Sequence, residues 1–250
     1  MTMAKATALR PGALGALLLI LAAAGAAAAR PQDPQAALVR AWAPDDPTDH
    51  LLASADRPPP LTPEGARLLA QRLAERKAPD PQFDRTRWCA GPGMPRIMLM
   101  PYPFEIKAER GYLAFLFGWY RWYRLVDMSG QEPQFELPTT MGYSAGHWDG
   151  RTLVIRTVGL EDETILDASG LPHSDRMALT ERLRVLPNGH LEERVTIDDP
   201  AFYTRPWTAV ATYHPAPAGI VGDDLCPDRI ARGEPAVAGG RRPAGRGAAQ

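Results

Sequence analysis

The stretch that decides the fold runs from residue 141 to residue 197 and reads MGYSAGHWDGRTLVIRTVGLEDETILDASGLPHSDRMALTERLRVLPNGHLEERVTI. It contains two dipeptides that are typical of tight β-hairpin turns, Asp149-Gly150 and Asn188-Gly189. The segments 152–158, 177–186 and 191–197 are apolar runs that follow or flank these turns, and branched side chains recur along them. The stretch therefore predicts three β-strands with a buried face.

Further strands are expected on both sides of this stretch. Aromatic and branched residues are frequent in segments 97–99, 104–106, 112–126 and 207–213. This gives seven to nine short strands and no alternation of strands with helices. The fold class is therefore mainly β, and we expect an antiparallel lipocalin-like barrel with one N-terminal helix and an interior cavity, with a β-sandwich as the alternative.

The remaining segments define the predicted domain organisation. A helix is expected over residues 61–78, because Thr62 can cap its start, Pro63 suits its first turn and Leu69 and Leu73 share one face. Residues 30–60 are rich in Pro and Asp and are expected to form an extended N-terminal arm. The β-barrel domain is assigned to residues 86–228, and residues 229–250 are expected to be a disordered tail.

The N-terminus indicates the compartment. Lys5 and Arg10 precede an apolar run over residues 13–24, and small residues follow it, so residues 1–29 resemble a secretory signal peptide. The alternative is a permanent membrane anchor, but the run is short and rich in Ala. We therefore expect a periplasmic or secreted protein with no membrane span after signal cleavage.

The two cysteines, Cys89 and Cys226, are expected to form one disulfide in an oxidising compartment. A reactive thiol is the alternative. The formal net charge is −1 and no run of Lys or Arg alternates with aromatic residues, so nucleic acid is not an expected partner. The five histidines are scattered without ligand spacing, so we expect no metal site, and no motif indicates a cofactor.

Three polar residues are candidates for chemistry inside the barrel. Alternation places Glu181 and Glu193 on the buried faces of neighbouring strands, where two carboxyl groups would raise the pKa of at least one of them. His173 lies on a loop at the end of the strand that carries Glu181, and it could transfer protons with that residue. The alternatives are that the glutamates pair with arginines and that His173 only fixes its loop.

The aromatic residues Tyr102, Trp119, Tyr143 and Trp148, together with Glu193, are the expected lining of a ligand pocket. Residues 142–146 also match the G-x-S-x-G pattern around Ser144, with Asp167 and His173 following in the order found in α/β-hydrolases. That motif needs a strand before the serine and a helix after it. A hairpin follows here instead, so a glycine-permitted bend is the preferred interpretation.

Several motifs together resemble a family of exported, uncharacterised bacterial proteins. The matching segments are PLTPEG at 60–65, residues 89–96, PYPFEI at 101–106, MGYSAGHWDG at 141–150, PHS at 172–174, ER at 181–182, IDDP at 197–200 and PW at 206–207. The resemblance covers roughly residues 58–226 and implies a secreted lipocalin-like domain without a stated activity. The chain departs from the family pattern at Gly118, Tyr143, Arg156 and Ile165.

These features leave three classes of function open. The first is an exported single-domain β-barrel that binds a small, mostly apolar molecule in its interior. The second is a cofactor-independent acid–base enzyme, an isomerase, lyase or hydratase, that uses Glu181 and His173. The third is an interaction module of the cell envelope, in which the Pro-rich arm docks a partner.

Overall fold

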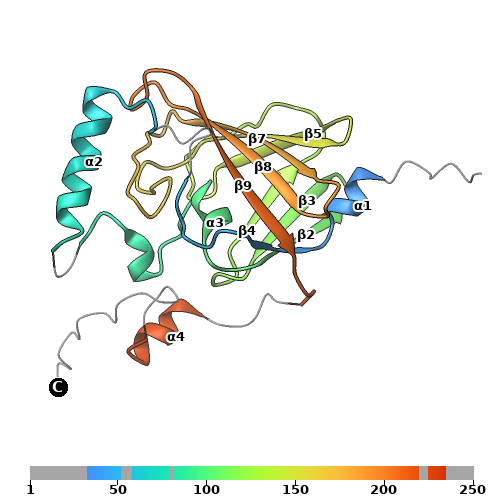
Figure 1. Ribbon diagram of the computed structural model, residues 1–250, viewed down its shortest axis with the longest axis horizontal. Helices are drawn as coiled ribbons and strands as arrows, with labels where there is room; N and C mark the ends of the chain where they lie inside the picture. Colours follow the sequence, from blue (N-terminus) through green and yellow to red (C-terminus); the bar gives the residue numbers. More distant parts are fainter. Residues whose placement is uncertain (1–32, 52–57, 79–80, 220–224, 235–250) are drawn as a thin grey trace, which may run out of the picture. The chain divides into compact units, whose positions relative to one another are not determined.

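The computed structural model describes residues 33–51, 58–78, 81–219 and 225–234. The predicted signal peptide and most of the predicted tail lie outside the described residues. Nine strands form a closed barrel in sequence order (Figure 1). They are β1 Ala41–Pro44, β2 Phe104–Glu109, β3 Tyr112–Phe117, β4 Tyr123–Asp127, β5 Tyr143–Asp149, β6 Thr152–Val158, β7 Ala178–Val185, β8 Leu191–Asp198 and β9 Trp207–Pro215. The mainly β, lipocalin-like barrel predicted from the sequence is confirmed.

The two predicted hairpin turns join β5 to β6 and β7 to β8. Gly150 and Gly189 have positive φ values of 58° and 84°, which a glycine adopts without a steric penalty. The two hairpins pair with each other through β6 and β7, where Leu153 lies opposite Leu183 and both side chains are fully buried. All neighbouring strands pair antiparallel except β4 and β5, which run parallel. This parallel junction determines where a groove opens, as described below.

The described helices are α1 Pro34–Leu38, α2 Pro63–Glu75, the 3-10 helix η1 Arg85–Trp88, α3 Arg96–Leu99 and α4 Cys226–Ala231. Helix α2 corresponds to the helix expected over residues 61–78. Its start is capped as expected, because the Thr62 hydroxyl accepts a hydrogen bond of 3.1 Å from the backbone N–H of Gly65.

Segment 97–99 was expected to be a strand, but the structure shows the helix α3 there. All four residues of α3 are buried. A short apolar run that is buried on all sides has no visible period, so its pattern does not distinguish a strand from a helical turn.

Segment 112–126 was expected to be one strand, and the structure divides it into β3 and β4. The turn between them places Tyr120 and Arg121 at φ values of 49° and 61°. Such a turn usually carries Asn or Gly, and because neither is present here, no local pattern indicates the turn.

Part of the segment expected to be an extended arm belongs to the barrel. Strand β1 pairs with β2 and with β9, and it thereby closes the cylinder. Trp42 of β1 is fully buried, and its indole Nε1 donates a hydrogen bond of 3.0 Å to the carbonyl oxygen of Leu38. A strand of four residues is too short to show a period of two, which explains why the sequence pattern did not reveal it.

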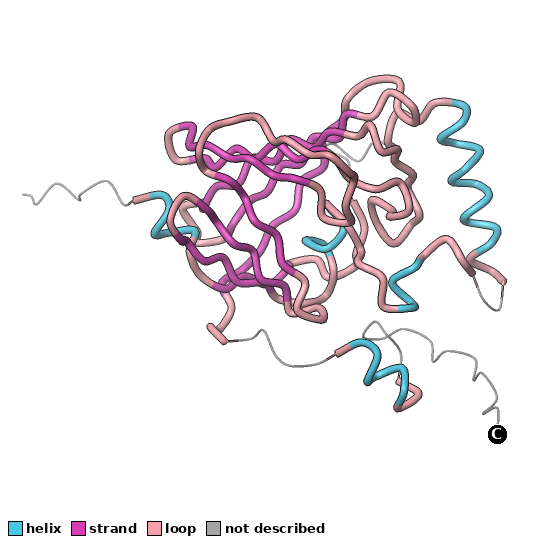
Figure 2. Tube along the Cα trace, turned by 180° about the vertical axis from the view of Figure 1, so that it is seen from behind, coloured by secondary structure: helices cyan, strands magenta, loops and turns pink. Residues whose placement is uncertain are grey.

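Large side chains fill the centre of the barrel. Trp42, Phe104, Phe115, Phe117 and Tyr213 are buried, and the ring centroids of Phe104 and Tyr213 lie 5.2 Å apart in an edge-to-face arrangement. Helix α1 covers one end of the barrel, and α3 lies toward the other end (Figures 1 and 2). The space expected to hold a ligand is therefore occupied by the protein's own core.

The disulfide predicted from the two cysteines is present between Cys89 and Cys226. Within the described residues, no helix has the length and apolar character needed to cross a membrane.

A buried charge cluster lies around α3. The Arg96 guanidinium donates to Asp49 at 3.0 Å and to both oxygens of Asp84 at 2.7 and 2.9 Å, and Arg96 is only 3% exposed. Burial raises the pKa of Asp49 to about 7, although Arg96 acts against this rise. Burial also opposes ionisation of Asp84, but the charge of Arg96 outweighs it and lowers the pKa of Asp84.

The raised pKa of Asp49 predicts a pH-dependent stability. An acid that binds its proton more tightly in the native state stabilises the fold most below its unfolded pKa, near 3.8, and loses this contribution as the pH rises to about 7. In the wild type, the free energy of unfolding is expected to decline by up to about 1.4 kcal/mol per pH unit between pH 4 and 7. The Asp49→Asn variant keeps an acceptor oxygen for Arg96 but has no ionisable group at this position, so it is expected to lack this decline. Urea titrations of both proteins across this range measure the difference.

The matched control is Asp84→Asn. Because the pKa of Asp84 is lowered, its contribution is present above pH 4 and is lost in acid. This variant is expected to be less stable than the wild type at pH 7, with the difference shrinking toward pH 3. If Asp49→Asn and Asp84→Asn change the pH profile in the same direction, the assignment of the neutral carboxyl group to Asp49 is wrong.

Candidate binding groove

The junction between β4 and β5 opens a groove in the barrel wall. Parallel strands cannot be joined by a tight hairpin, so segment 128–142 must cross back to the start of β5. The two strands pair only through Val126 with Ser144 and Asp127 with Ala145. A groove with a volume of about 610 Å³ lies between β4, the connecting segment and the first residues of β5. Its size fits a small organic molecule.

Aromatic and apolar side chains form much of the groove wall. Tyr112, Tyr123 and Leu125 remain 46%, 59% and 52% exposed on the outer face of β3 and β4. Tyr143 stacks on Phe135 of the connecting segment, with ring centroids 5.9 Å apart. Large apolar side chains that stay exposed together around a concave surface are typical of a binding site. The other lining residues include Trp122, Gln131, Glu132, Pro133, Thr139, Thr140 and Met141.

Arg124 and Ser144 line the inner part of the groove and connect it to the barrel interior. Arg124 Nε donates to the Ser144 hydroxyl at 2.8 Å, and Nη2 donates to the Thr157 hydroxyl at 2.6 Å. Nη1 donates to Glu181 Oε1 at 2.8 Å, and Nη2 also binds Glu181 Oε2, so the carboxylate is held by two nitrogens. Arg124 is 2% exposed and Glu181 is fully buried. Four of the five N–H groups of the guanidinium therefore have partners within the protein.

Glu193 and Tyr213 extend this polar network on the far side of Glu181. The register places Leu183 opposite Glu193 and Glu181 opposite Val195, so the two glutamates are diagonal neighbours on one face. Burial, followed by the charge of Glu181, raises the pKa of Glu193 well above its ordinary value. The Tyr213 hydroxyl donates to Glu193 Oε2. The raised pKa favours the protonated form of Glu193, whereas Glu181 forms the ion pair with Arg124.

His173 lies in a different environment. Its Nε2 atom is 2.7 Å from the Thr164 hydroxyl and its Nδ1 atom is 3.1 Å from the Ser174 carbonyl oxygen. Burial lowers the pKa of this imidazole, which favours its neutral form. The hydrogen-bond partners of His173 and those of Glu181 have no residue in common, and neither residue lines the groove.

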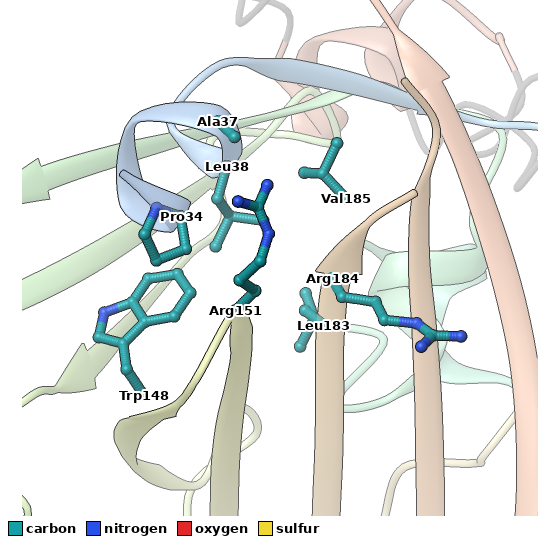
Figure 3. A pocket seen from close by; sticks show the side chains of 8 residues that line it. All are labelled: Pro34, Ala37, Leu38, Trp148, Arg151, Leu183, Arg184 and Val185. Atoms are coloured by element: carbon teal, nitrogen blue, oxygen red, sulfur yellow. The ribbon is translucent and has the colours of Figure 1, made fainter. Parts of the chain in front are cut away.

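The other predicted pocket residues do not come together. Tyr143 lines the groove, while Trp119 is fully buried and Glu193 lies in the interior network. Trp148 lies beneath α1, where Figure 3 shows it beside Pro34 at a pocket of only about 10 Å³. Tyr102 lines neither of these two spaces.

The G-x-S-x-G pattern does not form a hydrolase site. Ser144 lies within β5, and its hydroxyl contacts Arg124 and, at 2.9 Å, Thr157. Asp167 binds the backbone N–H of Leu51 and so holds a loop. Within the described residues, no group of three His, Cys, Asp or Glu side chains has the arrangement of a metal site.

Arg124 is the residue that the sequence analysis missed. While residues 112–126 are treated as one strand, alternation places Arg124 on the opposite face of that strand from Phe115. The turn at residues 118–122 resets the alternation, and Arg124 points inward opposite Phe115. The available signal was an arginine among aromatic residues in the same domain as two glutamates expected to be buried, because a buried carboxylate needs a basic partner.

Two of the four positions singled out in the sequence, Tyr143 and Arg156, lie at or beside the groove. Tyr143 forms part of its wall. Arg156 Nε is 3.1 Å from Glu132, which is itself a lining residue. Gly118 and Ile165 do not line the groove.

The sequence matches no protein-family model and no curated protein. The groove itself is therefore the basis for a functional conclusion.

Proposed function

We propose that this protein binds a small, mostly apolar molecule in the groove between β4 and segment 128–142. The main support for this proposal is the groove of about 610 Å³, which is lined by exposed aromatic side chains and, at its inner end, by the polar residues Arg124 and Ser144. Tyr123 and Leu125 follow one another on the outer face of β4, so they can contact one side of a flat ligand. The Ser144 hydroxyl at the inner end offers a polar contact that orients it.

The barrel supports this use because it holds β4 and the start of β5 in place. Arg124 lies on β4 and Ser144 lies on β5, and the hydrogen bond between them joins the two walls of the groove. Because Arg124 also binds Glu181, both walls are anchored to the same buried ion pair. A site built on such rigid elements loses little conformational entropy on binding. Export to the periplasm or the medium remains part of the proposal, and the disulfide is compatible with it.

The acid–base enzyme is less well supported. Glu181 is held by Arg124 and His173 is held by Thr164, and neither residue lines the groove. A candidate acid and base must both reach one substrate. The interaction-module hypothesis is weakened for part of the arm, because β1 is built into the barrel.

Binding can be tested with the uncharged probe 2-naphthalenemethanol in calorimetric titrations. Leu125→Ala and Tyr123→Ala are expected to weaken binding by about tenfold each, because each removes roughly 1–2 kcal/mol of apolar contact. Since both side chains are more than half exposed, the stability of the fold should change little.

Leu73→Ala is the matched control, because Leu73 is a 43% exposed leucine on α2 and does not line the groove. It should bind the probe like the wild type. Failure of the wild type to bind, or equal affinities in all four proteins, contradicts the proposed site.

A further inference from the structure

We infer that the groove selects ligands by charge, and that its ligand is a hydrophobic cation, such as an amine with an aromatic or aliphatic body, rather than an anion. This inference rests on the proposed binding function and adds the chemical class of the ligand. Three charged residues line the groove: Arg124, Asp127 and Glu132. Their partners decide which charge the groove can still accept.

The single basic residue of the lining is not available to an anion. Both terminal nitrogens of Arg124 bind Glu181, and its Nε binds Ser144. An anionic ligand would have to displace a buried carboxylate from a two-nitrogen contact, which leaves that carboxylate without its counter-charge. A fatty acid or an aromatic acid therefore gains no ion pair in this groove.

The acidic residues of the lining differ in their partners. Glu132 pairs with Arg156 at 3.1 Å on the surface. Asp127 Oδ1 accepts a hydrogen bond of 2.8 Å from the backbone N–H of Ser129. Within the described residues, no basic side chain forms an ion pair with Asp127. Of the charged groups that line the groove, the Asp127 carboxylate is therefore the one without an oppositely charged partner among the described residues.

The position of Asp127 brings it next to the aromatic wall. Tyr123, Leu125 and Asp127 alternate along β4 and share its outer face. Tyr112 lies directly opposite Asp127 on β3, at the distance at which cross-strand side chains touch. An ammonium group beside Asp127 can therefore also contact a tyrosine ring, and the electron-rich face of such a ring attracts cations. The ligand's apolar body then lies along Leu125 and Tyr123.

The experiment compares three probes with one aromatic body: 2-naphthylmethylammonium, 2-naphthalenemethanol and 2-naphthoate. The ammonium probe is expected to bind about five- to tenfold more tightly than the alcohol, and 2-naphthoate is expected to bind more weakly than the alcohol. The preference should decrease in 0.5 M salt, because the contact with Asp127 lies at the surface.

Asp127→Asn keeps the oxygen that accepts from Ser129 and removes the charge. It is expected to make the ammonium probe bind like the alcohol and to leave the affinity for the alcohol unchanged. Asp198→Asn is the matched control, since Asp198 ends β8 on another part of the barrel wall and does not line the groove. It should keep the full preference.

The outcomes separate the two proposals. If the alcohol binds but 2-naphthoate binds as tightly as the ammonium probe, or if Asp127→Asn keeps the preference, charge selection is refuted and the binding function stands. If none of the three probes binds, the proposed binding function is refuted and charge selection with it.

Discussion

Glu181→Gln is expected to lower the free energy of unfolding by about 3–5 kcal/mol, as is typical when one partner of a buried ion pair is removed. The substitution keeps the shape of the side chain and an acceptor oxygen. It leaves the Arg124 guanidinium in the barrel interior without the carboxylate that binds it through two nitrogens. Urea unfolding at pH 7 measures the loss.

Glu193→Gln is the control in the same network. Burial and the charge of Glu181 raise the pKa of Glu193 well above its ordinary value, which favours the protonated form, and glutamine resembles that form. The variant is expected to change the free energy of unfolding by less than about 1 kcal/mol.

The double variant Glu181→Gln/Glu193→Gln sharpens the test. In the single Glu181 variant, Glu193 is relieved of its charged neighbour and can ionise to compensate Arg124 in part. When both acids are replaced, no carboxylate remains in the network, so the loss should exceed the sum of the two single losses. Equal losses for the two single variants would contradict the assignment of the charge to Glu181.

The hairpins show which parts of this fold can be predicted from the sequence. Asp149-Gly150 and Asn188-Gly189 reveal β5 to β8, because a glycine at positive φ leaves a local signal. The turn at Tyr120 and Arg121 leaves none, since the surrounding structure holds two ordinary residues in that conformation. Missing this turn reversed the expected direction of the Arg124 side chain.

The groove could not be predicted for a related reason. It depends on the parallel pairing of β4 and β5, which is a long-range property that no single segment encodes. The alternation in β7 and β8 did predict that Glu181 and Glu193 face the interior, because each strand is long and one face is apolar. Arg124, the partner of Glu181, comes from β4, which lies three strands away from β7 around the barrel. Local patterns therefore located the two acids but not the arginine that pairs with Glu181.

Replacing both cysteines by serine is expected to lower the free energy of unfolding by about 4–5 kcal/mol. The disulfide joins residues 137 positions apart in the sequence, and strands β2 to β9 all lie between them. In the loop-entropy description, the bridge acts mainly by restricting the unfolded chain, and its effect increases with the length of the closed loop. The Cys89→Ser/Cys226→Ser protein should therefore unfold at a lower urea concentration than the oxidised wild type.

The same description predicts that the native barrel is unchanged without the bridge, because Cys89 and Cys226 lie outside the strands. Near-ultraviolet circular dichroism of the double variant should match that of the wild type, and its affinity for 2-naphthalenemethanol should be the same. The wild type treated with reductant is the matched control and should unfold together with the double variant. If both unfold within about 1 kcal/mol of the oxidised wild type, restriction of the unfolded chain is not what the disulfide contributes.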